Sequence, residues 1–281
     1  MRLDGKALAE TILTHLRTRV AALKQHGVTP TLAVIQVGDD SGSTAYIRQK
    51  QKAAEAIGAR IILSHQLSAV SCQQLKTIIE QFNNDKSVHG IILQRPLPAS
   101  IADHTKALCS LIDPTKDVDG FLPNSPYPVP VAKAVLKILT QQVQLTGPGP
   151  VKKQGQAPSI VILGRGETAG KPITEALTKL GCHVTVVHSQ TDNPDTITKS
   201  ADILVSCVGK PNVVRRDNMK AGAILISVGI TRAADGKLHG DYEEDQIRDH
   251  ASLYTPTPGG VGPVNVACLM ENLVQAATKV L

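Results

Sequence analysis

The chain is poor in aromatic residues: only 2% of its 281 residues are aromatic, with no Trp, two Phe and four Tyr. Its cores must therefore be built from Ala, Val, Ile and Leu, and a Tyr beside polar residues becomes a candidate for a functional role. No apolar run approaches the roughly 20 residues that a membrane helix needs. The first 20 residues carry a charge every few positions. A signal peptide is therefore not expected, and we predict a cytoplasmic protein without a membrane partner.

Cysteine is also scarce. The five cysteines are odd in number and far apart, and no C-x-x-C pair occurs. This spacing argues against a disulfide framework and against a thiolate metal site, and it suits a reducing compartment. No bound metal is expected. The cysteines are Cys72, Cys109, Cys182, Cys207 and Cys268.

A concentrated basic surface is missing from the sequence as well. The formal net charge is +6, but Lys and Arg are scattered along the chain. Nucleic-acid binders usually combine a basic face with a recognisable module or with stacking aromatics, and neither is visible. A nucleic-acid partner is therefore not expected. The mild positive bias suits small anionic ligands such as phosphates or carboxylates.

Short β-branched strands alternate with helices in both halves of the chain. This alternation predicts an α/β fold with largely parallel sheets. Strands are expected at 31–38, 59–67, 88–94, 159–164, 183–187, 201–209 and 223–230. Helices are expected at 4–26, 43–57, 71–85, 132–144, 167–181 and 263–280. The four prolines of 121–131 indicate irregular chain, and the Gly, Pro and Lys residues of 146–158 indicate a linker or exposed loop.

These elements predict two α/β domains around a cleft. Residues 1–139 and 264–281 would form the first domain. Residues 140–263 would form the second, a Rossmann-like parallel-sheet domain that binds a dinucleotide.

The dinucleotide prediction begins from a strand, a glycine turn and a helix. Gly164, Gly166 and Gly170 follow the strand 159–164. Such glycines let the backbone approach a pyrophosphate, and the start of the helix stabilises its negative charge. Alone the signal is weak, because many α/β proteins without a nucleotide have such a turn.

Two features indicate NADP rather than NAD. NAD sites usually have an acid at the end of the second strand for the ribose hydroxyl. Here that strand ends in His188 and Ser189, and Arg165 lies within the glycine turn. A guanidinium, an imidazole and a hydroxyl suit a 2′-phosphate. Alternatively, His188 and Ser189 cap a strand and Arg165 is a solvated charge.

Four polar residues in the first half are candidates for catalysis. Tyr46 and Lys50 are four residues apart on an expected helix and therefore share a face. Gln94 ends an expected strand, and Asp119 precedes a glycine. Individually each has a common structural explanation: a helix surface pair, a solvated Gln and a turn Asp.

In combination, six motifs resemble the methylenetetrahydrofolate dehydrogenase/cyclohydrolase family. They are, in order, Y-x-x-x-K-x-K, G-I-I-L-Q-x-P-L-P, K-D-V-D-G-F, G-R-x-x-x-x-G-K-P, V-G-K-P and T-P-x-P-G-G-V-G-P. The resemblance covers nearly the whole chain. It implies hydride transfer from 5,10-methylenetetrahydrofolate to NADP and hydrolysis of the methenyl product to 10-formyltetrahydrofolate. It also implies a homodimer.

The same resemblance implies roles for individual residues. Lys50 would move protons for the hydrolysis, and Gln94 would orient its amine. Tyr46 would stack on the folate rings, and Asp119 would accept hydrogen bonds from the pterin. Further residues implied to contact the ligands are Val208, Gly209 and Ile230 for the cofactor, and Pro258, Gly259, Gly260 and Val261 for folate.

The chain departs from the family's pattern at several positions. The segment 121–133 is shorter and lacks a P-C-T-P-x-G signature. Gly166 stands where a serine is common, and Arg95 stands where an apolar residue is common. Ser227 and Thr231 replace an acid and an amide near the cofactor.

Three alternatives remain at this point. The shortened 121–133 segment favours a monofunctional dehydrogenase with weak or no cyclohydrolase activity. A two-domain oxidoreductase of the shikimate dehydrogenase kind would share the architecture, although the Gln94 and Pro-Gly-Gly motifs speak against it. A catalytically silent folate or nucleotide binder is the third.

Overall fold

The computed structural model describes residues 1–142, 158–233 and 236–280. The chain divides into two compact units. The three-stranded unit comprises Ala9–Pro130 and Val266–Leu281, and the five-stranded unit comprises Met1–Leu8 and Val131–Asn265. The predicted boundary near residue 139 between a folate-binding and a dinucleotide-binding domain stays a prediction, because these units are defined by contacts between residues and not by function. The expected linker at 146–158 lies outside the described residues except for Pro158.

The three-stranded unit is built on a small parallel sheet. Its strands are β1 (Thr31–Val37), β2 (Arg60–Gln66) and β3 (Gly90–Leu93). The order is β2-β1-β3, with Ile35 of β1 opposite Leu93 of β3. All seven residues of β1 are buried because the strand is central. This explains why its sequence is largely apolar, without the alternation of a half-exposed strand.

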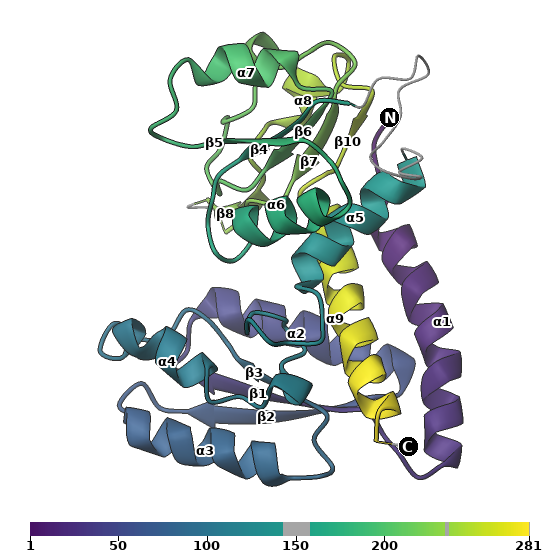
Figure 1. Cartoon of the computed structure of the whole chain (residues 1–281), viewed down its shortest axis with the longest axis vertical. Helices are drawn as coiled ribbons and strands as arrows, with labels where there is room; N and C mark the ends of the chain where they lie inside the picture. Colours follow the sequence, from purple (N-terminus) through teal and green to yellow (C-terminus); the bar gives the residue numbers. More distant parts are fainter. Residues whose placement is uncertain (143–157, 234–235, 281) are drawn as a thin grey trace. The chain divides into compact units, whose positions relative to one another are not determined.

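Helices cover both faces of this sheet. Figure 1 shows α2 (Ser41–Ile57) and α3 (Cys72–Asn84) on opposite sides of the strands. Asp40 caps α2 by accepting a hydrogen bond from Ser43 N at 2.7 Å, and Ser71 caps α3 in a capping box. Apolar residues of α3 and α4 join β1 and β3 in one core cluster. Three short elements of this unit are η1 (Ala102–His104), α4 (Thr105–Cys109) and η2 (Pro114–Lys116).

The proline-rich segment after η2 has no helix or strand from residue 117 to 129. The irregular chain expected at 121–131 is confirmed up to residue 129, and the next helix, α5, begins at Pro130 rather than at 132. The segment is nevertheless closely packed. A Cβ at Gly120 would lie 2.5 Å from the carbonyl oxygen of Tyr127, so the chain must approach itself there without a side chain. Buried Asn272 donates to the carbonyls of Val118 and Pro128, each at 2.8 Å. These contacts hold the segment on either side of Asp119.

The five-stranded unit contains a doubly wound parallel sheet. Its strand order is β10-β7-β6-β4-β5. The strands are β4 (Ile160–Leu163), β5 (Val184–Val187), β6 (Ile203–Ser206), β7 (Ile224–Ser227) and β10 (Leu253–Tyr254). The chain passes from β4 to β5 on one side and then returns to β6 on the other. This reversal creates a topological switch point beside β4, where ligands of open α/β sheets bind.

The other elements of this unit surround the sheet or extend it. Leu3 N donates to the carbonyl of Tyr254 at 2.9 Å, so the first residues of the chain pair with β10. The boundary between the units falls within the two long helices α1 and α9. Most of α1 (Gly5–Gln25) and of α9 (Val261–Thr278) belongs to the three-stranded unit, and only their first turns belong to the five-stranded unit. The other elements of the five-stranded unit are α5 (Pro130–Gln142), α6 (Gly170–Lys179), α7 (Pro194–Ser200), η3 (Arg216–Asn218), the antiparallel pair β8 (Thr231–Arg232) and β9 (Leu238–His239), and α8 (Glu244–Ile247).

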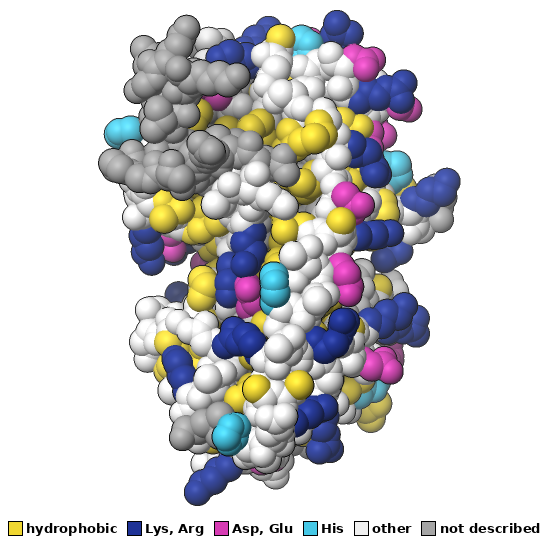
Figure 2. Space-filling model, turned by 90° about the vertical axis from the view of Figure 1, so that its right-hand side faces the viewer, with side chains coloured by type: hydrophobic (Ala, Val, Ile, Leu, Met, Phe, Trp, Pro, Cys, Tyr) yellow, Lys and Arg dark blue, Asp and Glu magenta, His cyan; other side chains and the backbone are white. Residues whose placement is uncertain are grey.

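The predicted α/β class with parallel sheets is confirmed. The helix expected at 167–181 begins at Gly170, because the preceding residues form the glycine turn. None of the described helices is both long and apolar enough to span a membrane. On the face shown in Figure 2, basic side chains are scattered and interspersed with acidic ones.

Candidate active site

The structure brings Lys50 and Gln94 into direct contact. Lys50 lies on α2, and Gln94 directly follows the carboxyl end of β3. Lys50 Nζ donates to Gln94 Oε1 at 2.8 Å, and Gln94 Nε2 donates to the Arg95 carbonyl at 2.9 Å. The second bond orients the amide so that its oxygen faces the amine. The expected pair therefore exists, with a neutral partner for the lysine.

The environment of Lys50 favours the neutral amine. Burial lowers the pKa of Lys50, the positive charge of Arg95 lowers it further, and the negative charge of Asp119 opposes both. Burial is the largest of these causes. A lowered pKa increases the fraction of neutral amine at a given pH, and the neutral amine is the form that a general base requires.

Tyr46 and Asp119 belong to the same unit as this pair. Tyr46 lies one helical turn before Lys50 on α2, and 36% of its surface is exposed. Asp119 is partly buried and follows Val118, which is fully buried. Its position close to Lys50 is reflected in the electrostatic effect on that amine. An exposed aromatic ring and a carboxylate near a buried amine are suitable contacts for a polar heteroaromatic ring.

Arg95 is a further charged residue at this site. Its guanidinium lies 4.3 Å from the centre of the Phe121 ring, a cation–π contact. Its carbonyl accepts hydrogen bonds from Gln94 and from Ser43 Oγ. In the sequence, Arg95 stood out only because the family commonly has an apolar residue at this position. Its electrostatic influence on Lys50 depends on the folded loop.

The glycine turn of the five-stranded unit follows β4 at the switch point. Gly164 has φ +97°, and a Cβ on Gly170 would lie 2.1 Å from the carbonyl oxygen of Gly164. Only glycine permits this approach between the turn and the start of α6. No side-chain hydrogen bond caps α6 at Ala169. Lys171 N donates to the Gly166 carbonyl at 3.0 Å, so the turn is closed onto the helix start. The close backbone approach at the glycines and the positive end of the α6 dipole suit a pyrophosphate, so the residues fit the expected dinucleotide.

Arg165 and the turn after β5 lie together. An Arg165 guanidinium nitrogen donates to Gln190 Oε1 at 3.1 Å, and Gln190 N lies 3.2 Å from His188 Nδ1. Ser189, between them, is exposed. Gln190 is neutral and does not compensate the charge of Arg165. The sequence did not single out Gln190, whose contact with Arg165 joins residues 25 positions apart.

The other residues expected near the cofactor also occupy this unit. Gly209 has φ +69°, and its Cβ position lies 3.4 Å from the carbonyl oxygen of Ile230. Val208 is 38% exposed. The predicted Val208, Gly209 and Ile230 are thus close to one another at the ends of β6 and β7.

The loop Pro258–Val261 belongs to the five-stranded unit up to the start of α9. A Cβ on Gly260 would lie 2.5 Å from the Pro256 carbonyl oxygen, and one on Gly5 would lie 1.9 Å from the Gly260 oxygen. Glycine is therefore required where this loop meets the start of α1. Gly259 has φ +105°, and the nearest atom to its Cβ position is Lys6 Cε at 3.7 Å. Pro258 is exposed.

Among the described residues, no group of three His, Cys, Asp or Glu could hold a metal ion. The fold and the glycine turn are those of a dinucleotide-dependent α/β enzyme, and the lysine–glutamine pair in the other unit is its candidate catalytic centre.

Comparison with known proteins gives the family. Residues 3–119 match the tetrahydrofolate dehydrogenase/cyclohydrolase catalytic domain, and residues 133–281 match the NAD(P)-binding domain of the same family. The chain is 40% identical to the bifunctional protein FolD of Lactococcus lactis subsp. cremoris over 99% of this chain and 96% of that one. This chain belongs to the tetrahydrofolate dehydrogenase/cyclohydrolase family.

Solved structures agree with this assignment. The bifunctional FolD of Campylobacter jejuni superposes with a TM-score of 0.91 at 34% identity, covering 100% of this chain and 99% of that one. The FolD of Trypanosoma brucei, complexed with NADP and an inhibitor, gives a TM-score of 0.89 at 33% identity and covers 100% of this chain and 98% of that one. The expected NAD(P)-binding domain is confirmed, and assignment to the shikimate dehydrogenase kind is excluded.

The electrostatics of Lys50 generate a prediction. Arg95→Leu should raise the pKa of Lys50, because a neighbouring cation disfavours the protonated amine and leucine keeps an apolar contact with Phe121. At a fixed pH below this pKa, Lys50 should then react more slowly with an amine reagent. Mass spectrometry of the Lys50 peptide across a pH series measures this. Arg48→Leu, which removes the same charge from the exposed side of α2, is the matched control. Identical pH profiles for both variants would contradict the effect.

Proposed function

We propose that this chain oxidises 5,10-methylenetetrahydrofolate to 5,10-methenyltetrahydrofolate with NADP and then hydrolyses the product to 10-formyltetrahydrofolate. The observation that carries the proposal is the Lys50–Gln94 hydrogen bond, in a unit that matches the family's catalytic domain. A partly buried lysine paired with a neutral amide has the chemistry that the hydrolysis needs.

NADP is proposed to bind at the carboxyl edge of the five-stranded sheet. Its pyrophosphate would lie against Gly164, Gly166 and the start of α6 at Gly170. Arg165, His188 and Ser189 would hold the 2′-phosphate. The guanidinium of Arg165, whose hydrogen-bond partner Gln190 is neutral, supports a preference for NADP over NAD. When bound, the nicotinamide accepts the hydride.

The folate is proposed to bind beside Lys50. Tyr46 would stack on its rings, and Asp119 would accept hydrogen bonds from the pterin. Backbone atoms of Pro258, Gly259, Gly260 and Val261 would also contact the ligands; the space around Gly259 supports this role.

Oxidation converts a neutral methylene compound into a methenyl cation. A protonated lysine beside the reacting carbon would repel that cation. Neutral Lys50, hydrogen-bonded to the uncharged Gln94, avoids the repulsion, and the carboxylate of Asp119 supplies a compensating charge. The protein contributes chiefly by holding the methylene carbon in a geometry suited to hydride transfer.

Hydrolysis of the cation then requires proton transfer. The oxygen of a water molecule forms a bond to the methenyl carbon, and Lys50 accepts the proton that the water loses. The hydroxyl of the adduct next gives up its proton as the carbonyl forms, the bond from carbon to N5 breaks, and N5 gains a proton. The formyl group remains on N10, and Lys50 finally releases its proton to solvent.

The monofunctional alternative is not favoured, since the chain matches bifunctional relatives over its full length. The shortened 121–133 segment is anchored to the catalytic unit by a buried side chain. Tyr127 is buried, and its hydroxyl donates to the Thr115 carbonyl at 2.9 Å.

A homodimer in the cytoplasm completes the proposal. Five free cysteines suit a reducing compartment, and the family resemblance supports the dimer. Sedimentation velocity at several protein concentrations tests the oligomeric state.

The first test follows reduced cofactor and the methenyl intermediate separately, with purified protein, 5,10-methylenetetrahydrofolate and either NADP or NAD. Reduced NADP together with methenyl decay faster than the buffer blank is expected. Dehydrogenation with decay only at the blank rate would establish the monofunctional alternative. A folded protein that binds folate or nucleotide without turnover would establish the third alternative, a catalytically silent binder.

Lys50→Gln should lower the cyclohydrolase rate by about 10²–10⁴-fold, the usual contribution of a general acid–base group. NADP binding should be retained because Lys50 is in the other unit. Methenyl decay and calorimetric NADP titration measure the two effects. Lys52→Gln removes an exposed lysine from the same helix and should change neither. Unchanged methenyl hydrolysis in the Lys50 variant would refute the role of this amine.

Arg165→Ala should raise the KM for NADP by about tenfold or more, since a charge-assisted hydrogen bond contributes about 1.5–3 kcal/mol. The KM for NAD, which lacks the 2′-phosphate, should change much less. Steady-state kinetics with both cofactors give the ratio. Lys179→Ala, at the exposed far end of α6, is the control for the loss of one positive charge. An equal effect of Arg165→Ala on both cofactors would remove the 2′-phosphate assignment.

A further inference from the structure

Asp241 is a fully buried carboxylate that the proposed reaction leaves without a role. It follows β9 and is 0% exposed. Its Oδ2 accepts hydrogen bonds from Ser206 Oγ at 2.6 Å and Val208 N at 3.0 Å. Its Oδ1 accepts from Gly209 N at 2.8 Å and Lys210 N at 3.0 Å. Three consecutive backbone N–H groups of one loop therefore point to a single side chain.

The surrounding backbone is shaped to admit this carboxylate. A Cβ on Gly229 would lie 2.4 Å from Asp241 Oδ2 and 2.5 Å from Oδ1, so only glycine leaves room there. Asp241 N in turn donates to Ser227 Oγ at 3.0 Å. On the other side of the loop, Thr231 Oγ1 donates to the Gly209 carbonyl. The loop Val208–Lys210 is thus held by its N–H groups on one side and by a carbonyl on the other.

This loop lies beside the glycine turn. Cys207 N donates to the Leu163 carbonyl at 2.8 Å, and a Cβ on Gly164 would lie 3.0 Å from the Cys207 carbonyl oxygen. In the strand order β5-β4-β6-β7, the 2′-phosphate residues follow β5 and the glycine turn follows β4. A dinucleotide that crosses the switch point from β5 through β4 reaches β6 and β7 with its other half. The loop after β6 is therefore on the nicotinamide side.

We propose that Asp241 is a positioning residue for NADP: its carboxylate holds Val208–Lys210 in the conformation that receives the nicotinamide half of the cofactor. The inference rests on the proposed NADP-dependent function. In this proposal, the buried carboxylate of Asp241 fixes the conformation of the loop and does not contact the ligand itself.

The test replaces the carboxylate by an amide of the same shape. In Asp241→Asn, one acceptor oxygen becomes an NH₂ group that faces N–H or O–H donors in a buried site, so the loop must shift. The Kd for NADP, measured by calorimetry without substrate, should rise about tenfold. The Kd for 2′-phospho-ADP-ribose, which lacks nicotinamide, should change less than twofold. The NADP-to-NAD ratio of kcat/KM should stay constant, and methenyl hydrolysis should be retained.

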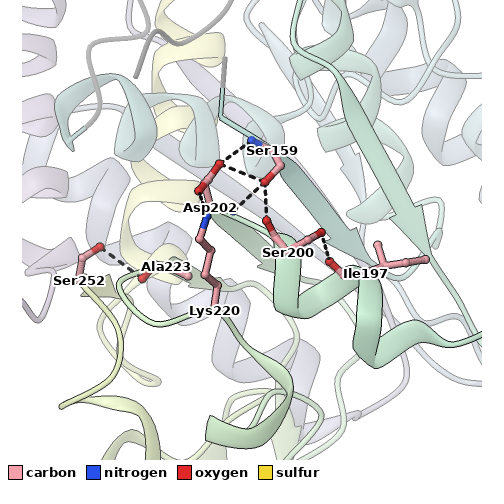
Figure 3. Close-up of polar contacts among 7 residues, drawn as sticks. All are labelled: Ser159, Ile197, Ser200, Asp202, Lys220, Ala223 and Ser252. Atoms are coloured by element: carbon pink, nitrogen blue, oxygen red, sulfur yellow. Dashed lines mark hydrogen bonds and ion pairs between the residues drawn. The ribbon is translucent and has the colours of Figure 1, made fainter. Parts of the chain in front are cut away.

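Asp202→Asn is the matched control. Figure 3 shows Asp202 with Ser159 and Lys220; its carboxylate accepts from Ser159 N at 2.9 Å and Ser159 Oγ at 3.1 Å, and Lys220 Nζ lies 2.6 Å away. It thus also binds backbone and hydroxyl donors, but it precedes β6, at the amino ends of the same strands. The control should leave the Kd for NADP within twofold even if it lowers the melting temperature.

If Asp241→Asn does not fold, the variant Thr231→Val tests the role of the loop instead. It releases the Gly209 carbonyl and leaves the buried carboxylate intact, and it should weaken NADP about threefold without affecting 2′-phospho-ADP-ribose. A wild-type protein that does not bind NADP would overturn the proposed function. If the wild-type protein binds NADP and the folded loop variants bind it with the same Kd, the role of Asp241 is overturned and the proposed function stands. The same holds if the variants lose affinity equally for NADP and for 2′-phospho-ADP-ribose.

Discussion

Parallel pairing of strands is the constraint on which the rest of this molecule depends. Parallel strands cannot be joined by tight turns, so the chain crosses over after every strand and begins the next strand at the same edge. All loops that leave the strands therefore gather at the opposite, carboxyl edge of the sheet. Gln94 leaves β3 in one unit, and Gly164, His188 and Cys207 leave β4, β5 and β6 in the other. Each unit thereby gathers its polar residues without any local sequence signal joining them.

The three-stranded unit must keep an amine buried without forcing it to be charged. A carboxylate at the position of Gln94 Oε1, 2.8 Å from Lys50 Nζ, would strongly favour the ammonium form. The amide oxygen satisfies the same hydrogen bond without a net charge. Burial and Arg95 lower the pKa of Lys50, whereas Asp119 acts in the opposite direction. The protonation of this lysine therefore depends on a balance that includes Arg95, a residue outside the family's pattern.

Features that depend on residues close together in the chain could be predicted from the sequence, whereas features that depend on residues far apart could not. β1 and β3 are short, largely apolar runs, and α2 and α3 have apolar periodicity with clear ends, so local physics predicts them. Short elements such as α8 and the β8–β9 pair lack enough residues for a periodic signal. The Lys50–Gln94 pair was recognised only through combined motifs. Asp241 could not be predicted, because its donors lie 31–35 positions away and only the folded loop brings them to it.

Three residues near the proposed cofactor site depart from the family's pattern in the same physical way: Gly166, Ser227 and Thr231. Gly166 closes the turn through its carbonyl, which accepts from Lys171 N at 3.0 Å, and nothing lies within 4 Å of its Cβ position. Glycine is therefore not sterically required there, and no side chain at 166 contributes to phosphate binding. Ser227 and Thr231 make internal hydrogen bonds that support the same loops. These positions preserve backbone geometry with uncharged side chains. In the proposed cofactor site, recognition of the 2′-phosphate would consequently rest on fewer groups, chiefly Arg165, while the neighbouring loops are held by contacts within the unit.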